Sequence, residues 1–282
     1  MSSEILVIGE TLVDLVPGPD GREAILGGSP YNVAIGLGRL GAPVAIATSI
    51  STDKDGKRFK TALEDDDVDL TYTAIVDAPS PTALVEEGTK ESGPRYIFTL
   101  TGTAFDQPAH MPAHWPSSLK HIHAGSIAAI LGPMAKSVLE AFSNARGRVT
   151  TSYDPNIRPM ITPDHEMTCH DVEERVALVD IVKASEEDLE WLYPQRPAHE
   201  VAFDWLSRGA RLVIVTRGGK GAEAFTKKDH LVVPAPAIRL GDTVGAGDSL
   251  MSALLFAMNR DDALGAHAKE WTQSALGKWL SF

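Results

Sequence analysis

The sequence predicts an α/β fold in which a doubly wound, mostly parallel sheet is flanked by helices, with a small β-sheet added to it. Short apolar runs of strand length alternate along most of the chain with segments of helical spacing, which is the pattern of βαβ units. Residues 71–104 break this alternation with several strand-like runs in succession. A chain of 282 residues is long enough to bury a core of its own as one large domain.

The first part of the chain begins with a buried strand. Residues 5–8 form an unbroken apolar run that Gly9 ends. Residues 30–40 have apolar or small side chains at helical spacing, with a proline in the first turn, where helices tolerate it. A second strand at residues 44–48 and a helix at residues 55–63 continue the alternation.

The sequence pattern from residue 71 to residue 104 predicts an antiparallel β-sheet insertion. The runs at residues 71–76, 82–85 and 95–100 have strand composition, and the Pro-Ser-Pro and Gly-Pro sequences between them are typical of turns. We expect residues around 12–25 to join the same small sheet.

The alternation of strands and helices resumes after the insertion. Connections of this kind place helices on both faces of a parallel sheet. Further strands are predicted at residues 121–124, 149–153, 181–183 and 212–216. Further helices are predicted at residues 133–144, 169–179, 185–192, 201–208, 250–258 and 267–282.

The formal net charge of −12, from 26 basic and 38 acidic side chains, argues against polyanionic partners. Proteins that bind nucleic acid or anionic membrane surfaces need clustered Lys and Arg, so we expect neither partner. The single cysteine, Cys169, cannot form an internal disulfide, which fits a reducing cytosol. No stretch reaches the ~20 apolar residues that span a bilayer and the N-terminus has no signal-peptide pattern, so we expect a cytoplasmic protein.

The most informative segment is Gly-Asp-Thr-Val-Gly-Ala-Gly-Asp-Ser at residues 241–249, directly before an apolar helix. The free N–H groups and the dipole at a helix start attract anions, and glycines let a ligand approach the backbone closely. Asp248 would repel a phosphate there unless it has another task, such as taking a proton from a hydroxyl. A glycine-rich turn with an acidic first-turn residue accounts for the same sequence equally well. The dinucleotide-binding and P-loop patterns are both broken, which disfavours those classes.

A second polar cluster opens the helix at residues 30–40. Gly27 and Gly28 permit close approach of a polar ligand, and the Asn32 side chain can both donate and accept hydrogen bonds. Asp14 follows the first strand, a place suited to binding hydroxyls. Taken singly, these residues fit an ordinary turn between strand and helix and a solvated loop aspartate just as well.

Three other segments have polar residues at strand ends. Arg158, in Asp-Pro-Asn-Ile-Arg-Pro at residues 154–159, is able to clamp a phosphate or carboxylate. The Gly-rich residues 215–221 end a strand and also fit a hairpin. Residues 183–188 fit either a capped helix start or a place near a phosphate-bound cation.

Taken together, these segments resemble the PfkB/ribokinase family of sugar and nucleoside kinases over nearly the whole chain. Residues 27–41, with Asn32, are similar to the N-terminal signature of the family, and residues 242–248 match its C-terminal signature. The resemblance implies a single ribokinase-like kinase domain over residues 1–282. It also implies a small β-sheet lid over the active site, formed by about residues 11–26 and 71–104.

The same resemblance implies an activity and its residues. MgATP would donate its γ-phosphoryl group to a primary hydroxyl, with Asp248 as the base and with ATP and Mg²⁺ as cofactors. The implied anion hole is formed by the N–H groups of Gly245, Ala246 and Gly247. The implied sugar-binding residues are Asp14, Gly28, Asn32 and Arg158. The implied nucleotide-binding residues are Thr216, Gly218, Gly221 and Ser185, and the implied metal-binding residue is Asp188.

Within the family, residues 98–104 and 154–159 are most similar to bacterial fructokinases, which predicts conversion of fructose to fructose 6-phosphate. Two other substrates stay open: 2-keto-3-deoxygluconate, whose carboxylate Arg95 or Arg158 could bind, and a nucleoside. A non-catalytic sugar or nucleotide sensor is the alternative of another class. It is favoured by Ser-Glu-Glu-Asp at residues 185–188, where the family has Asn-x-x-Glu.

The resemblance also bears on association and on monovalent cations. Lid sheets of this family often pair through their edges, which suggests a homodimer through the lid. Family members usually continue past residue 282 with a segment that helps to cover adenine and to form a monovalent-cation site. We therefore make no prediction about potassium.

Overall fold

A large and a small β-sheet organise the computed structural model, which describes residues 3–19, 21–86, 95–112, 114–162, 164–236, 245–268 and 271–281. All neighbours in the large sheet are parallel except those of the two last strands, which form an antiparallel edge. The predicted doubly wound, mostly parallel sheet is therefore confirmed. The large sheet runs in the spatial order β13 (His230–Val233), β12 (Ala222–Phe225), β11 (Leu212–Thr216), β10 (Ile181–Ser185), β9 (Thr150–Asp154), β8 (His121–Gly125), β1 (Ile5–Ile8), β4 (Val44–Ser51) and β5 (Thr73–Val76).

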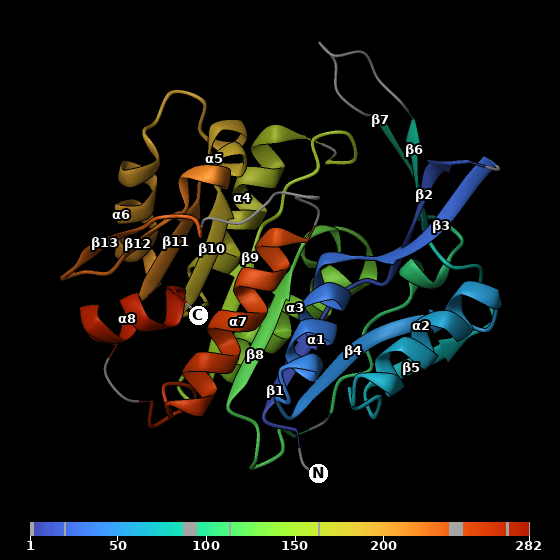
Figure 1. The fold of residues 1–282 in the computed structure, drawn as a ribbon, viewed down its shortest axis with the longest axis horizontal. Coiled ribbons are helices and arrows are strands. Elements are labelled where there is room, and N and C mark those ends of the chain that lie inside the picture. The colour runs from blue at the N-terminus through green and yellow to red at the C-terminus, as the bar shows by residue number, and fades with distance from the viewer. Residues whose placement is uncertain are drawn as a thin grey trace.

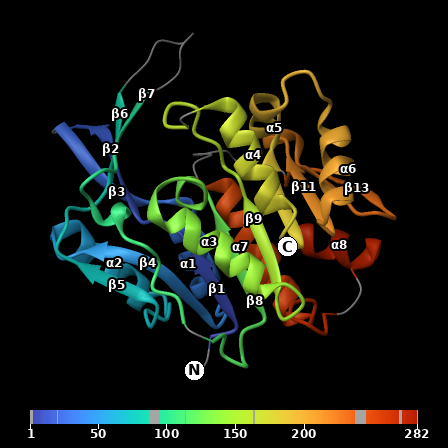
Figure 2. The ribbon, with the colours of Figure 1, turned by 180° about the vertical axis from the view of Figure 1, so that it is seen from behind.

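Helices cover both faces of this sheet (Figures 1 and 2). Successive side chains of a strand alternate between two cores: Leu6 and Ile8 pack on one face, and Ile5 and Val7 pack on the other. The continuous apolar runs in the sequence reflect this burial on both faces. One face carries α1 (Ser29–Arg39), α2 (Lys54–Asp65), α7 (Ala246–Arg260) and α8 (Gln273–Leu280), and the other carries α3 (Gly132–Ala145), α4 (His165–Val176), α5 (Glu186–Leu192) and α6 (Ala198–Arg208).

Several predicted helix boundaries are wrong, including the start of the helix expected at residues 250–258, which lies at Ala246. Two other cases have clear local reasons. The helix expected at residues 169–179 begins at His165, because the Asp164 carboxylate accepts a hydrogen bond from the Met167 N–H and caps it. The helix expected at residues 267–282 is shorter and lies at Gln273–Leu280, after Thr272 as N-cap. Both corrections depend on capping residues rather than on the apolar pattern.

The small sheet projects from the edge where the parallel strands of the large sheet end (Figure 1). Residues 12–25 take part in it, as expected, and its β6 pairs with β2 in parallel rather than in the expected antiparallel sense. The placement of residues 71–76 in this insertion is wrong, because β5 pairs in parallel with β4 of the large sheet through the α2 crossover. The strands of the small sheet are, in spatial order, β3 (Gly21–Gly27), β2 (Leu12–Gly18), β6 (Thr82–Glu86) and β7 (Arg95–Thr99).

The hairpin alternative for residues 215–221 is confirmed. A short 3₁₀ turn at Gly218–Lys220 connects β11 to β12, and β13 extends the sheet by one more antiparallel strand. Gly221 has a φ of 96°, and a Cβ there would overlap the Val233 carbonyl oxygen, so this turn requires glycine.

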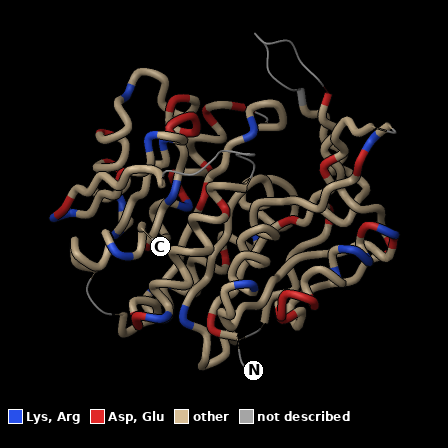
Figure 3. The backbone as a smooth tube through the Cα atoms, in the orientation of Figure 1, with Lys and Arg blue, Asp and Glu red and all other residues tan. Residues whose placement is uncertain are grey.

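Acidic and basic residues are spread over the fold instead of gathering on one face (Figure 3). In the part of the chain that the structure describes, no helix has both the length and the apolar character required to cross a membrane.

Candidate active site

A cavity of about 790 Å³ opens at the carboxyl ends of the parallel strands, beneath the small sheet. Open α/β sheets bind ligands in this position, because loops diverge there and leave a crevice. Ten of the predicted site residues contribute to its wall: Asp14, Gly28, Asn32, Arg158, Ser185, Asp188, Thr216, Gly245, Gly247 and Asp248.

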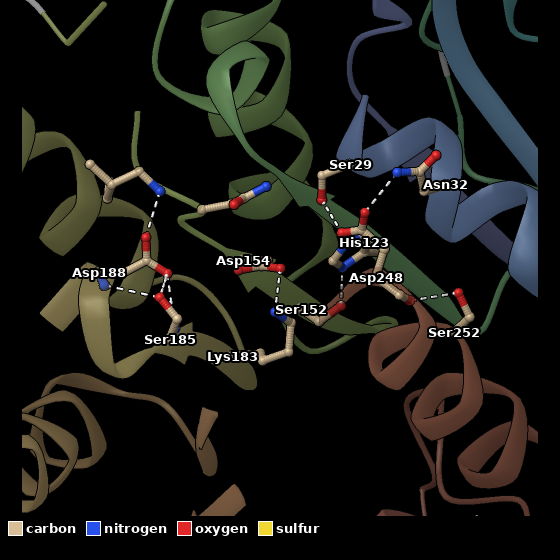
Figure 4. Close-up of polar contacts among 12 residues, drawn as sticks. Ser29, Asn32, His123, Ser152, Asp154, Lys183, Ser185, Asp188, Asp248 and Ser252 are labelled. Atoms are coloured by element: carbon tan, nitrogen blue, oxygen red, sulfur yellow. Dashed lines mark hydrogen bonds and ion pairs between the residues drawn. The ribbon is translucent and has the colours of Figure 1, made fainter. Parts of the chain in front are cut away.

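Asp248 lies in the first turn of α7 and is 8% exposed. Its two carboxylate oxygens accept hydrogen bonds from α1: Ser29 Oγ donates to Oδ1 at 2.6 Å, and Asn32 Nδ2 donates to Oδ2 at 2.8 Å (Figure 4). Gly36 lets α1 and α7 approach closely, since a Cβ there would overlap Ser252 Oγ. The two predicted signature segments are therefore joined by direct hydrogen bonds.

The start of α7 has the geometry of an anion site. Gly245 is its N-cap in the left-handed conformation, with a φ of 74°, and residues 241–244 of the motif lie outside the described residues. The first N–H groups of a helix have no partner within the helix and carry its positive dipole end. Gly245 and Gly247 border the cavity, whereas Ala246 is exposed and is not part of the cavity wall.

The paired glycines before α1 bring the backbone of two segments together. Gly28 has a φ of 104°, and a Cβ there would lie 2.6 Å from the Glu10 carbonyl oxygen. A Cβ on Gly27 would overlap Asp14 Oδ2, so Asp14 on β2 lies directly against the end of β3, just before α1. Burial raises the pKa of the Asp14 carboxyl, and the charge of Arg158 opposes this shift.

Arg158 is exposed at the cavity mouth, after the end of β9. Its guanidinium donates a hydrogen bond to Asn156 Oδ1 at 2.7 Å, which orients it along the loop. Its positive charge also acts on Glu10 and Asp14 across the cavity. Arg158 is thus accessible at the cavity mouth, and its binding of a ligand stays a prediction.

Glu10 is a cavity residue that the sequence prediction did not single out. It is 3% exposed, follows β1, and accepts a hydrogen bond from the Ala128 N–H at 3.1 Å. Burial raises the pKa of the Glu10 carboxyl to about 7, against the lowering effect of its hydrogen bonds and of Arg158. An acidic residue directly after the glycine that ends a buried strand was the signal available in the sequence.

Asp154 and Lys183 form a second group that the prediction missed. Lys183 Nζ lies 2.6 Å from Asp154 Oδ2, and both side chains are almost fully buried in the cavity wall (Figure 4). Burial raises the pKa of Asp154 to about 6, although the charge of Lys183 opposes it. The signal was a lysine inside the otherwise apolar strand β10, because lysines are rarely buried without a partner.

Ser185 and Asp188 form a capping box at the start of α5. Asp188 Oδ2 accepts from the Ser185 N–H at 2.8 Å and from Ser185 Oγ at 2.7 Å, and Oδ1 accepts from the Ile157 N–H at 2.7 Å. A carboxylate has about four acceptor positions, so about one remains at Oδ1. Metal binding by Asp188 stays a prediction, and no group of three or more Asp, Glu, His or Cys residues suited to a metal is found in the described ranges.

Only some of the predicted nucleotide-binding residues border the cavity in the structure. Thr216, at the end of β11, and Ser185 border the cavity. Gly218 and Gly221 lie in the turn beyond it, and neither belongs to the cavity wall. A Cβ on Gly218 would meet only open space, whereas Gly221 is packed against β13. Gly218 therefore has room for a ligand, while the structural role of Gly221 is sufficient to explain that glycine.

The small sheet supplies an apolar wall above these polar groups. Tyr96 and Phe98 of β7 are stacked with ring centroids 6.3 Å apart, and Leu12, Val16 and Ile25 lie on the same face. A mostly apolar wall with a few convergent polar groups is characteristic of small-molecule sites. This cavity is suited to a polar molecule of modest size with an anionic part near α7.

Known proteins share the sequence and the fold. The family model of pfkB family carbohydrate kinases matches residues 2–275. A fructokinase of Rhizobium leguminosarum bv. trifolii is 34% identical over 267 residues, which are 92% of this chain and 81% of that protein. The crystal structure of a fructokinase from Vibrio cholerae O395 with fructose, ADP and calcium ion has a TM-score of 0.82 at 26% identity, over 99% of this chain and 89% of that chain. An aminoimidazole riboside kinase from Salmonella enterica shares the fold, with a TM-score of 0.80 at 23% identity, over 99% of this chain and 90% of that chain.

Proposed function

Since the chain belongs to the pfkB family of carbohydrate kinases, we propose that it is an ATP-dependent fructokinase that forms fructose 6-phosphate. The observation that carries the proposal is the position of Asp248. A buried carboxylate at a helix N-terminus, in a cavity with Asp14, Asn32 and Arg158, combines a base with an anion site. Transfer of a phosphoryl group to a hydroxyl requires both of these groups at one place.

Asp248 acts as the base in this mechanism. It takes the proton of the primary hydroxyl while the oxygen attacks the γ-phosphorus, and the bond to the β-phosphate oxygen breaks. Ser29 and Asn32 hold the two carboxylate oxygens, so the base has a fixed orientation before substrate binds. The free N–H groups at the start of α7 stabilise the negative charge of the transferring group.

Sugar hydroxyls are bound in this proposal by the polar groups near α1. Asp14 accepts hydrogen bonds, Asn32 both donates and accepts, and Gly28 lets the substrate approach the backbone. Arg158 closes the site at its mouth. The fructokinase names of relatives of this chain support fructose as the substrate.

Among the described residues, few protein groups are available to bind Mg²⁺ in the cavity wall, but those present have the oxygen ligands that the ion prefers. Asp188 keeps about one acceptor position at Oδ1, beside Ser185 at the cavity wall, and this fits a hydrated Mg²⁺ that is bound mainly by phosphates. We assign Asp188 to hold the ion through this oxygen. When bound, Mg²⁺ neutralises phosphate charge during transfer.

A nucleoside is the second candidate for the acceptor substrate. Tyr96 and Phe98 give the cavity a stacked aromatic pair on the small sheet, which would suit a heterocyclic base. An aminoimidazole riboside kinase shares the fold, at an identity of 23%. The polar groups near α1 and the fructokinase relatives favour the sugar.

The test is an assay of ADP release coupled to a reporter, with ATP, Mg²⁺ and a panel of acceptors. The panel contains fructose, glucose, ribose, 2-keto-3-deoxygluconate and several nucleosides. We expect the highest kcat/KM with fructose. A higher value with the keto acid or a nucleoside would replace fructose as the substrate, and binding without turnover of any acceptor would favour a sensor.

We also propose that the small sheet acts as a lid over the cavity. We further propose that it forms the contact between two copies of the chain. β3 and β7 form its edges in the described structure, and edge strands offer unpaired backbone groups to a second copy. Light scattering of the wild type and of a proline variant at Ile97, which is 40% exposed on β7, tests this contact.

A cytoplasmic location belongs to the same proposal, because Cys169 is a free thiol and ATP is the substrate.

A further inference from the structure

Lys183 is a buried cation in the cavity wall. It is 4% exposed and lies in β10 between apolar neighbours. A buried ammonium loses its hydration, so it persists only where other groups compensate. Asp154 Oδ2 at 2.6 Å is the partner that the structure gives it. An ammonium has three protons to donate, so about two remain without an acceptor among the described residues.

Three carboxylates act on this one ammonium. Burial by itself would lower the pKa of Lys183, but the charge and hydrogen bond of Asp154, with the charges of Asp248 and Asp188, raise it. Lys183 therefore stays a cation at neutral pH. Asp248 and Asp188 accept hydrogen bonds from other residues, and among the described residues Lys183 Nζ contacts neither carboxylate directly.

The neighbouring histidine supplies no second buried charge. His123 is fully buried on β8, and burial together with the charge of Lys183 lowers its pKa to about 3. Its Nδ1 forms a hydrogen bond with Ser152 Oγ of the neighbouring strand β9 at 2.8 Å (Figure 4). Lys183 is thus the buried positive charge on this side of the cavity, in contrast to the exposed Arg158 at the mouth.

The position of the ammonium relative to α7 is unusual. A Cβ built on Gly247 would lie 3.1 Å from Lys183 Nζ, so the ammonium lies directly beside the first turn of that helix. The positive end of a helix dipole repels a cation. An anion that contacts both the helix N–H groups and the ammonium removes this repulsion, and it would accept the unused Lys183 protons.

We propose that Lys183 is a catalytic residue that donates hydrogen bonds to oxygens of the transferring phosphoryl group, beside the N–H groups of α7. This inference rests on the proposed kinase function. The new bond joins the sugar oxygen to phosphorus, the bond to the β-phosphate oxygen breaks with its electron pair going to ADP, and the hydroxyl proton goes to Asp248. Lys183 keeps its protons throughout, and Asp154 positions it.

The first test compares Lys183→Met, which removes the charge at similar length, with Lys183→Arg, which keeps it. We expect Lys183→Met to lower kcat by about 100-fold or more, as for loss of an oxyanion donor, with KM for the sugar changed by less than about 3-fold. Lys183→Arg should recover part of the rate. The control is Lys136→Met on α3, whose side chain is 83% exposed and which should behave as the wild type.

The double variant Asp154→Asn/Lys183→Met separates catalysis from folding. Breaking a buried ion pair on one side is strongly destabilising, whereas replacing both partners by neutral groups is often well tolerated. We expect the double variant to melt near the wild type and still to lack the rate that Lys183 supplies. A double variant with wild-type kcat would overturn the proposal, because Lys183 would then act only through stability.

A binding measurement gives a readout besides turnover. Calorimetric titration with ADP and with a non-hydrolysable ATP analogue should show that Lys183→Met weakens the analogue about 10-fold or more and ADP by less than about 3-fold. Equal weakening of both ligands would contradict a contact with the terminal phosphate. If the wild type turns over no acceptor, the proposed function fails, and this comparison still decides whether Lys183 contacts that phosphate.

Discussion

The Asn32 side-chain amide donates a hydrogen bond to Asp248 Oδ2 at 2.8 Å, although 216 residues separate the two in the chain. Ser29 donates to the other oxygen from the same helix start. The first turns of α1 and α7 are therefore one unit: the first orients the base, and the second adds the anion site. Changes in either turn are expected to affect catalysis more than stability.

Asp248→Asn should abolish turnover while fructose binding survives. An amide cannot take the hydroxyl proton, and loss of a general base costs typically about 10²- to 10⁴-fold in rate. The measurement is kcat together with calorimetric binding of the sugar. Asp65→Asn at the exposed end of α2 is the control and should keep the wild-type rate. Loss of sugar binding in Asp248→Asn would indicate that the carboxylate holds the substrate instead.

Asn32→Ala should lower kcat and raise KM for the sugar, each by about 10-fold, with a small change in melting temperature. The variant removes the donor to Asp248 Oδ2 and one of the groups proposed to bind hydroxyls. Steady-state kinetics over a range of fructose concentrations give both constants. An unchanged KM would restrict Asn32 to orienting the base.

Replacement of two glycines in the turn after β11 by alanine should lower the free energy of unfolding by different amounts. Gly221→Ala should lower the free energy of unfolding by about 2–4 kcal/mol, because its φ is 96° and a Cβ would overlap Val233. Gly218→Ala meets open space and should cost only about 1–2 kcal/mol for its left-handed backbone. If Gly218 contacts the nucleotide as predicted, its variant also raises KM for ATP several-fold.

Denaturant melts and ATP titrations check these two variants. Gly219→Ala is the control, because that residue also faces open space and its φ is not left-handed. A Gly218→Ala protein with the wild-type KM for ATP would remove Gly218 from the nucleotide site.

Glu10→Gln should change how stability depends on pH. Burial raises the pKa of Glu10 from 4.5 to about 7, so the folded state binds this proton more tightly than the unfolded state. Its contribution to stability is complete below pH 4.5 and is lost as the pH rises to 7, by about 3 kcal/mol in all. Glu10→Gln lacks this loss, and its stability relative to the wild type should therefore rise between pH 4.5 and pH 8.

The measurement is denaturant unfolding of both proteins at several pH values. Other titrating groups, Asp154 and His123 among them, occur in both proteins and cancel in the difference. Glu140→Gln, whose side chain is 62% exposed on α3, should show no such trend. A difference that is constant with pH would mean that the pKa of Glu10 is the same in the folded and unfolded states.

Local sequence was sufficient for most elements of the fold. Short strand-like runs between helical segments predicted β1, β4 and β8 to β11, and the runs of β1 and β11 are apolar almost throughout because both faces of these strands are buried. The Gly-Ala-Gly-Asp turn predicted the helix start that carries Asp248, because glycine and acid preferences there are properties of a few neighbouring residues. The strand at residues 73–76 was identified but assigned to the wrong sheet, since its pairing with β4 is not encoded in its own side chains.

The sequence by itself determined that this chain has a mostly parallel α/β sheet and two polar glycine turns, each at the start of a helix. Only the tertiary structure decided that Ser29 and Asn32 bind Asp248, that Glu10 is buried in the same cavity, and that Lys183 lies against Gly247. Periodicity and capping act over a few residues, so they can be recognised locally. The charges and pKa values of the site depend on burial and on partners from distant strands, and folding alone brings these together.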